Sequence, residues 1–120
     1  MASQCLPKDI TIKPAQGRLH VLFDDAEIIS TTKALELDEP GAPLRFYIPL
    51  EEVRPDLLLD SDTKTTCPYK GEANYFHLRS ATATAEDAAW YYLDPCEQVA
   101  GIKDHVAFWG DRIRFERSEV

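Results

Sequence analysis

The sequence predicts one mainly β domain of short antiparallel strands, arranged as a sandwich or a partly open barrel, with one or two short helices. Two observations carry this prediction: short runs of alternating apolar and polar residues follow one another closely, and turn formers, among them eight prolines, separate them. The 120 residues suit a single core, and 44% hydrophobic with 28% charged residues is ordinary globular composition. We expect one domain over residues 1–120, ordered from about 8 to 116, with loose ends at 1–7 and 117–120.

The first half of the chain reads as strands joined by tight turns. Pro14 ends the first strand because proline cannot donate to a ladder, and Asp24-Asp25 forms the turn of a hairpin. The run at 34–38 alternates and is too short for a stable helix. Strands are expected at residues 9–13, 18–23, 26–30, 34–38 and 44–48.

The second half begins irregularly and then returns to strands. Residues 50–54 and 56–59 read as single helical turns and 60–62 as a loop, so a long loop is expected on the approach to Cys67. Gly110-Asp111 between two alternating runs predicts a hairpin. Further strands are expected at 74–79, 88–93, 105–109 and 112–116, with a polar connection at 80–87 and a short helix at 96–102.

The stretch 65–75 concentrates a thiol, an amine and two phenols around one turn. Pro68 pushes Cys67 to extended geometry, and Gly71 supplies the positive φ that closes the turn. Lys70 can hold an anion as a point charge, and a cation near Cys67 favours its reactive thiolate. The alternative is that Cys67 packs as a small hydrophobe while Lys70 points to water.

This stretch carries a family resemblance. Thr65 to Gly71, followed by Ala73 and Tyr75, resembles the signature of the bacterial domain-of-unknown-function family 427 (DUF427), with Cys-Pro-Tyr-Lys-Gly as its core. The resemblance extends over about residues 18–115, through Glu39, Pro43, 47–49, 56–59, 90–95 and 106–109. It implies a small, mostly β, tent-like domain and brings no firm activity.

Members of that family are sometimes labelled nucleotidyltransferase-like, and the residues give that label no support. The five glycines are scattered, so no glycine-rich phosphate loop is present. Asp60 and Asp62 form a close carboxylate pair in a loop, where such pairs are usually solvated.

A second group of candidates is aromatic. Tyr69, Tyr75, Trp90 and Tyr92 could line a pocket for a flat ligand, whereas core and cross-strand packing is the alternative. Strand alternation puts Trp90 and Tyr92 on one face and Tyr91 on the other.

Arg45 shares a strand face with Tyr47, two residues on. It could bind a ligand carboxylate or phosphate, or it could pair with Glu39 or Asp56. If Arg45 and Lys70 converge, they form a two-cation anion site.

The cysteines and histidines predict neither a metal site nor a cofactor. Cys5, Cys67 and Cys96 are odd in number and widely spaced, which signals neither a disulfide framework nor structural zinc. His77 is expected to be structural, and His105 would act as a general base only if it faced Cys67.

Charge and targeting signals limit the partners. The net charge of −8 opposes a broad interface with a nucleic-acid polymer. The N-terminal residues lack a signal-peptide pattern, and no apolar run approaches the ~18 residues of a membrane span. We therefore expect a cytoplasmic protein without a membrane partner, and a homo-oligomer is left open.

These observations favour a domain that binds a small anionic or aromatic ligand beside the 67–75 loop. The expected ligand-binding residues are Arg45, Cys67, Tyr69, Lys70, Tyr75, Trp90 and Tyr92. One alternative is a thiol-dependent or nucleotide-handling enzyme that uses Cys67 or Lys70 as its catalytic residue. Another is a protein-interaction module in which the loop is architectural.

Overall fold

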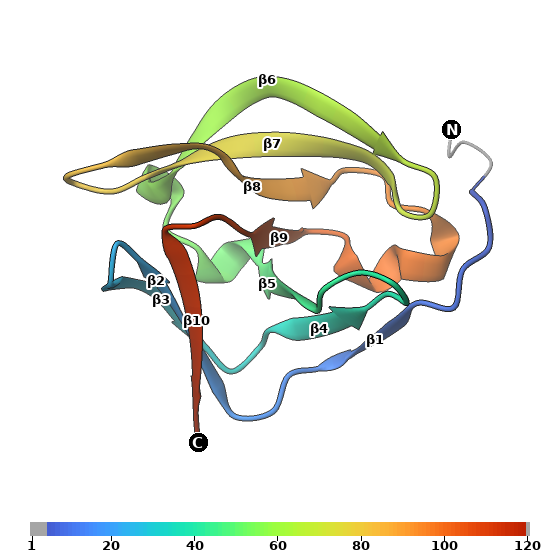
Figure 1. Ribbon diagram of the computed structural model, residues 1–120, viewed down its shortest axis with the longest axis horizontal. Coiled ribbons are helices and arrows are strands. Elements are labelled where there is room, and N and C mark those ends of the chain that lie inside the picture. The colour runs from blue at the N-terminus through green and yellow to red at the C-terminus, as the bar shows by residue number, and fades with distance from the viewer. Residues whose placement is uncertain (1–4, 120) are drawn as a thin grey trace.

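The computed structural model describes residues 5–119 as two antiparallel sheets (Figure 1). The larger sheet has seven strands in the order β1-β4-β5-β9-β8-β7-β6, and the smaller has three in the order β10-β2-β3. The strands are β1 (Thr11–Pro14), β2 (Arg18–Phe23), β3 (Ala26–Thr31), β4 (Leu35–Asp38), β5 (Arg45–Pro49), β6 (Leu58–Cys67), β7 (Gly71–Arg79), β8 (Thr84–Tyr92), β9 (His105–Phe108) and β10 (Ile113–Ser118). Three 3-10 helices, η1 (Leu50–Glu52), η2 (Pro55–Leu57) and η3 (Glu97–Ile102), lie between them. The predicted mainly β, antiparallel fold is confirmed, and the larger sheet ends at β1 and β6 without closing.

The two faces of the larger sheet bury different cores. Because side chains alternate along β5, Ile48 joins a core shared with the smaller sheet, whereas Tyr47 joins a second core on the opposite face. The second core is covered by η3, whose Val99 and Ile102 are fully buried. Burying each of these side chains contributes about 1.5–3 kcal/mol, which fixes η3 against this face.

The approach to Cys67 differs from the prediction. Residues 58–67 form one ten-residue edge strand, β6, paired with β7 as far as Cys67 opposite Gly71. The helical turns expected at 50–54 and 56–59 are confirmed in part, as η1 and η2, but the second ends at Leu57. The prediction of a long loop was wrong because an edge strand with a solvated face can carry polar, threonine-rich sequence. β8 likewise begins at Thr84, so the connection after β7 is shorter than expected.

The expected hairpin around Gly110-Asp111 is also wrong. β9 pairs with β5 and β8 in the larger sheet, whereas β10 pairs with β2 in the smaller one. The turn therefore carries the chain from one sheet to the other. By contrast, the predicted β2–β3 hairpin is confirmed, and both turn residues, Asp24 and Asp25, have positive φ.

The first described residues, Cys5 and Leu6, are bound to segments far away in the sequence. Cys5 forms a disulfide with Cys96, 91 residues away, and the Leu6 N–H donates to the Pro68 carbonyl at 2.8 Å. The expectation that the cysteines form no disulfide was wrong, because spacing along the chain does not reveal a pair that only folding brings together. At the other end β10 reaches Ser118, and residues 1–4 and 120 of the predicted loose ends lie outside the described residues. Between residues 5 and 119, no helix has the length and apolarity needed to cross a membrane.

Candidate functional site

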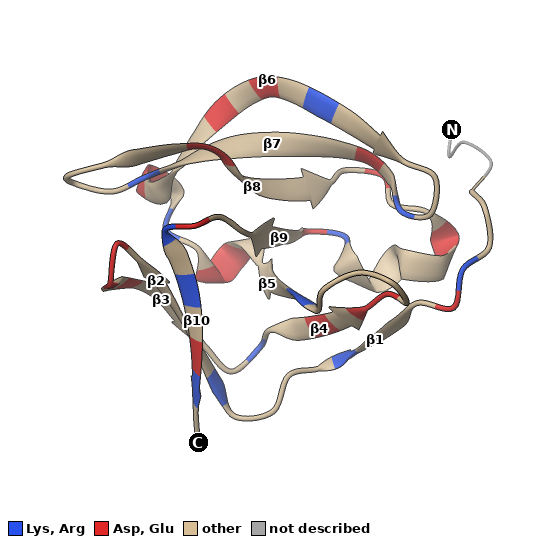
Figure 2. Ribbon diagram, viewed as in Figure 1, with Lys and Arg blue, Asp and Glu red and all other residues tan. Residues whose placement is uncertain are grey.

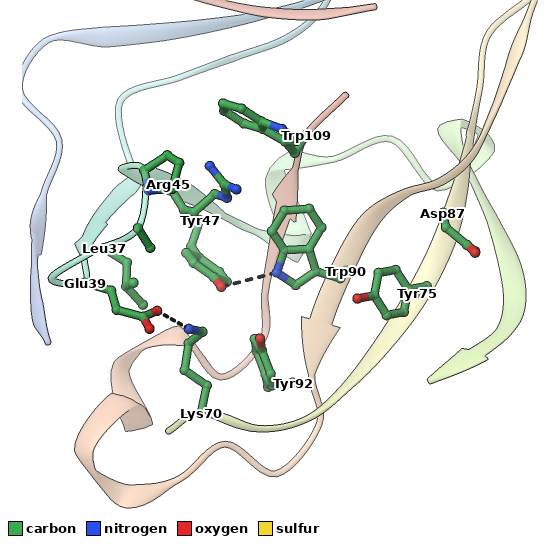
Figure 3. Close-up of a pocket in the computed structure, with 12 residues that line it drawn as sticks. Leu37, Glu39, Arg45, Tyr47, Lys70, Tyr75, Asp87, Trp90, Tyr92 and Trp109 are labelled. Atoms are coloured by element: carbon green, nitrogen blue, oxygen red, sulfur yellow. Dashed lines mark hydrogen bonds and ion pairs between the residues drawn. The ribbon is translucent and has the colours of Figure 1, made fainter. Parts of the chain in front are cut away.

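A cavity of about 380 Å³ lies on the second-core face of the larger sheet, bordered by β4, β5, β7, β8 and their connections (Figure 3). It lies on the same face as Tyr47 and Tyr92 of the second core. Its lining residues are Leu37, Glu39, Ala42, Pro43, Arg45, Tyr47, Lys70, Tyr75, Asp87, Trp90, Tyr92 and Trp109.

Arg45, the first residue of β5, places a guanidinium between two indoles. Its Cζ lies 3.9 Å from the ring centroid of Trp109 and 5.9 Å from that of Trp90. Its Nη1 is buried without a hydrogen-bond partner, and within residues 5–119 no carboxylate forms an ion pair with it. Burial lowers the pKa of the guanidinium, which nevertheless stays charged at neutral pH. The cavity therefore contains a partly desolvated positive charge that has no ion-pair partner among the described residues.

Neutral phenols form the aromatic wall of the cavity. The Trp90 indole N–H donates to the Tyr47 hydroxyl at 3.3 Å. Burial raises the pKa of Tyr47 to about 12 and raises the pKa of Tyr92 as well. Neither phenol ionises near neutral pH, so these residues supply polar contacts and ring surface and do not act as bases.

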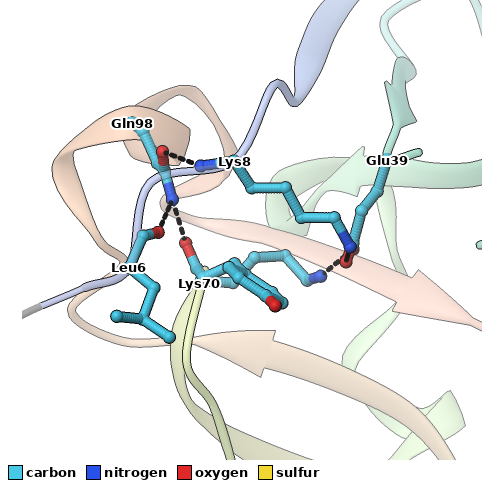
Figure 4. Close-up of polar contacts among 6 residues, drawn as sticks. Leu6, Lys8, Glu39, Lys70 and Gln98 are labelled. Atoms are coloured by element: carbon cyan, nitrogen blue, oxygen red, sulfur yellow. Dashed lines mark hydrogen bonds and ion pairs between the residues drawn. The ribbon is translucent and has the colours of Figure 1, made fainter. Parts of the chain in front are cut away.

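Glu39 joins two lysines at the rim of the cavity (Figure 4). The Lys8 Nζ donates to one carboxylate oxygen at 2.8 Å, and the Lys70 Nζ donates to the other. Burial opposes ionisation of Glu39, but the hydrogen bonds from Lys70 and Lys8 outweigh it and lower the pKa of this carboxyl. Lys70 is therefore already engaged by a carboxylate.

The turn that carries Lys70 is held by backbone contacts from other segments. The carbonyl of Tyr69 accepts a hydrogen bond from the Gln98 side chain at 2.8 Å, and that of Lys70 accepts one from the Cys96 N–H at 2.8 Å. Gln98 also donates to the Leu6 carbonyl at 2.9 Å, as Figure 4 shows. The turn thus has an architectural role in addition to positioning the Lys70 amine.

The structure brings five of the seven predicted ligand-binding residues to one cavity: Arg45, Lys70, Tyr75, Trp90 and Tyr92. The other two, Cys67 and Tyr69, do not line it. Cys67 ends β6 and is partly buried against the second core. The Tyr69 ring instead has the Lys8 ammonium 4.5 Å from its centroid.

Tyr75 is the least buried of the cavity's tyrosines, and its hydroxyl is shared with the neighbouring strand. It hydrogen-bonds the Thr65 hydroxyl at 2.9 Å. Its ring centroid lies 6.4 Å from that of Trp90.

The ion pairs that the sequence suggested for Arg45, with Glu39 or Asp56, are not formed. Glu39 binds the two lysines, and Asp56 pairs with Arg54.

Sequence reasoning missed Trp109 and Asp87 as lining residues. Trp109 could have been found, because it lies two residues beyond the buried Ala107 and so continues that face of β9. Asp87 breaks the alternation: the β7–β8 register shifts at Phe76/Leu78, Asp87 has a φ of 53°, and its side chain reaches the same cavity as Trp90. No local signal marks such a bulge.

The hydrogen bonds of His77 and His105 are to residues other than Cys67. His77 accepts the Asp87 backbone N–H at 3.1 Å, a structural contact. His105 bonds the Lys103 carbonyl at 2.8 Å and lines a separate depression with Tyr91. Within residues 5–119, no three His, Cys, Asp or Glu side chains gather closely enough to hold a metal ion.

Comparison with known proteins identifies the family. No protein of curated function matches the chain. The family described as a domain of unknown function (DUF427) matches residues 11–119, a range that includes all ten strands and every residue that lines the cavity. The chain therefore belongs to the DUF427 family.

Proposed function

We propose that this domain binds a small organic anion in the cavity between β5 and β8. The observation that carries the proposal is the Arg45 guanidinium, partly desolvated, stacked on Trp109 and without a carboxylate partner. Leaving a charge unpaired in a desolvated site is costly, and an incoming anion would remove that cost.

Size and lining support the same proposal. A volume of about 380 Å³ falls near the lower end of the ~300–1,000 Å³ of small-molecule sites. The walls are mostly aromatic and aliphatic, with a few polar groups, which is the composition expected of a ligand pocket.

The catalytic alternatives find less support in this arrangement. Cys67 does not line the cavity, and no histidine contact that would activate its thiol is observed among the described residues. The Lys70 amine is bound to the Glu39 carboxylate, so it is not free to act as a nucleophile in this arrangement. Binding without a covalent step by the protein is the simpler function for this site.

Thermal unfolding with a panel of carboxylates, phosphates, sulfonates and neutral analogues tests the proposal. A ligand at about 100 times its Kd stabilises the folded protein by about 2.7 kcal/mol, or several degrees in Tm for a domain of this size. We expect at least one anion to raise the Tm of the wild type but not that of Arg45→Gln.

Arg54→Gln is the matched control, because Arg54 is exposed and its ion pair is with the exposed Asp56. It should keep the full ligand-induced shift. The proposal is refuted if no anion shifts the wild type, or if Arg45→Gln responds as strongly as Arg54→Gln.

We also propose that the domain acts in the cytoplasm, without a nucleic-acid polymer or a membrane as partner. The net charge of −8 supports the absence of a nucleic-acid partner. The Cys5–Cys96 disulfide argues against a cytoplasmic location, because disulfides persist mainly in oxidising compartments. Cell fractionation checks this point, and light scattering distinguishes a monomer from a homo-oligomer.

A further inference from the structure

Building on the proposed function, we infer that the bound anion is a monocarboxylate joined to a flat, apolar ring system. Three properties of the cavity lead to this ligand class: the number of uncompensated charges, the scarcity of unpaired polar groups, and the orientation that stacking imposes on Arg45.

Among the described charged side chains that line the cavity, one cation has no carboxylate partner and can pair with one negative charge of a ligand. Four charged side chains face it, and one cation, Lys70, is bound to Glu39. Asp87 accepts hydrogen bonds from the Ser61 and Thr63 hydroxyls, at 2.5 and 2.7 Å. Arg45 therefore remains as the cation without a carboxylate partner among the twelve described lining residues. A second ligand charge, as on a phosphomonoester, would face the carboxylates of Glu39 and Asp87 instead of a free cation.

Two of the three lining tyrosines already have hydroxyl partners within the protein. Tyr47 accepts the Trp90 indole N–H, and Tyr75 bonds the Thr65 hydroxyl. These contacts reduce the hydrogen-bonding capacity that is left for a sugar or another polyhydroxylated body. Five of the twelve lining residues are aromatic, and this surface suits a flat apolar body.

Stacking restricts how Arg45 can meet a ligand. Because the Trp109 ring lies 3.9 Å from Cζ, one face of the guanidinium is covered. Its N–H groups lie in the guanidinium plane, so an acceptor must approach along the edge. A planar carboxylate matches that edge, and Trp90 and Trp109, which line the cavity beside Arg45, offer ring surface to the attached ring system.

The two tryptophans of the chain both line the cavity, which gives a direct reporter. We would titrate the ¹⁵N-labelled full chain with naphthoate and follow the two indole N–H signals by NMR, above neutral pH. The comparison probes are naphthamide, which lacks the charge, naphthyl phosphate, which carries two charges, and cyclohexanecarboxylate, which is not flat. Naphthoate should shift both indole signals and bind about tenfold or more tightly than each of the other three.

The variants separate this inference from the proposed function. Arg45→Gln should abolish the preference for naphthoate over naphthamide, and Arg45→Lys, which keeps the charge without the planar fork, should restore it only in part. An unchanged backbone NMR spectrum confirms that each variant is folded. Tighter binding of naphthyl phosphate, lost in Arg45→Gln, overturns the monocarboxylate inference and leaves anion binding at Arg45 intact. Equal binding of naphthoate and naphthamide, or binding by neither, overturns the inference, and failure of the wider anion panel overturns the proposed function as well.

Discussion

Glu39 is the residue on which the charge balance of the site depends. It follows β4, yet it binds Lys8 from the N-terminal segment and Lys70 from the β6–β7 turn. With 11% of its side chain exposed, it is shielded enough for these contacts to matter more than an ordinary surface pair. It thereby leaves Arg45, and not Lys70, as the uncompensated cation.

Glu39→Gln should lower the free energy of unfolding at neutral pH by about 2 kcal/mol, because two ammonium groups lose their partner. The pKa of Glu39 is lowered in the folded protein, so its contribution is present above the ordinary carboxyl value of 4.5 and is lost as pH falls through the lower folded value. Urea unfolding at a series of pH values should show the gap between wild type and variant closing in acid. A gap that stays constant with pH would contradict this assignment, and Glu51→Gln, at an exposed position, should leave stability unchanged.

At the scale of elements, the β6–β7 hairpin presents Lys70 to the cavity. Its turn spans the three residues between Cys67 and Gly71, and Gly71 is buried with a φ of +117°. A Cβ there would lie 3.3 Å from the Asp94 carbonyl oxygen. The positive φ favours glycine, and the space for an added Cβ is tight.

Gly71→Ala should therefore lower the free energy of unfolding by about 1–3 kcal/mol, measured by chemical denaturation. The matched control is Gly101→Ala in η3, where φ is not positive and an added Cβ would meet only the Ile12 Cγ2 at 4.0 Å. That substitution should change stability by no more than about 0.5 kcal/mol. Equal effects of the two substitutions would show that the turn does not need a positive φ at Gly71.

At the scale of the whole molecule, the Cys5–Cys96 disulfide joins residues 91 positions apart in the 120-residue chain. It joins the N-terminal segment, which carries Lys8, to the segment that precedes η3. Figure 2 shows acidic and basic residues distributed along strands of both sheets. The bridge and the two cores thus hold segments that are distant in sequence next to one another. The charged residues are spread over both sheets.

Reduction of this disulfide should lower the free energy of unfolding by about 2–5 kcal/mol, because the unfolded chain gains conformational freedom. Thermal unfolding with and without reductant measures the effect, and Cys5→Ser should be insensitive to reductant. Thiol titration of the denatured chain should find one thiol, that of Cys67, before reduction and three afterwards. Three thiols in the unreduced protein would rule the bridge out.

Local pattern was enough to predict the β fold and part of the cavity. Alternation assigns Arg45 to the face of Tyr47, and Trp90 to the face of Tyr92, and all four line the cavity. It fails at Asp87, where a bulge reverses the side-chain direction, and at Cys67 and Tyr69, which are close in sequence to Lys70 but face elsewhere.

The sequence by itself determined most of the strands, though not β6, and which neighbouring side chains share a face, because the two-residue period is a property of each strand alone. Only the tertiary structure decided the partners: β9 and β10 in different sheets, Cys5 with Cys96, and Trp109 over Arg45. These contacts join segments far apart in the chain. Their formation depends on the balance between the entropy of loop closure and the packing of both cores, which no local window of sequence contains.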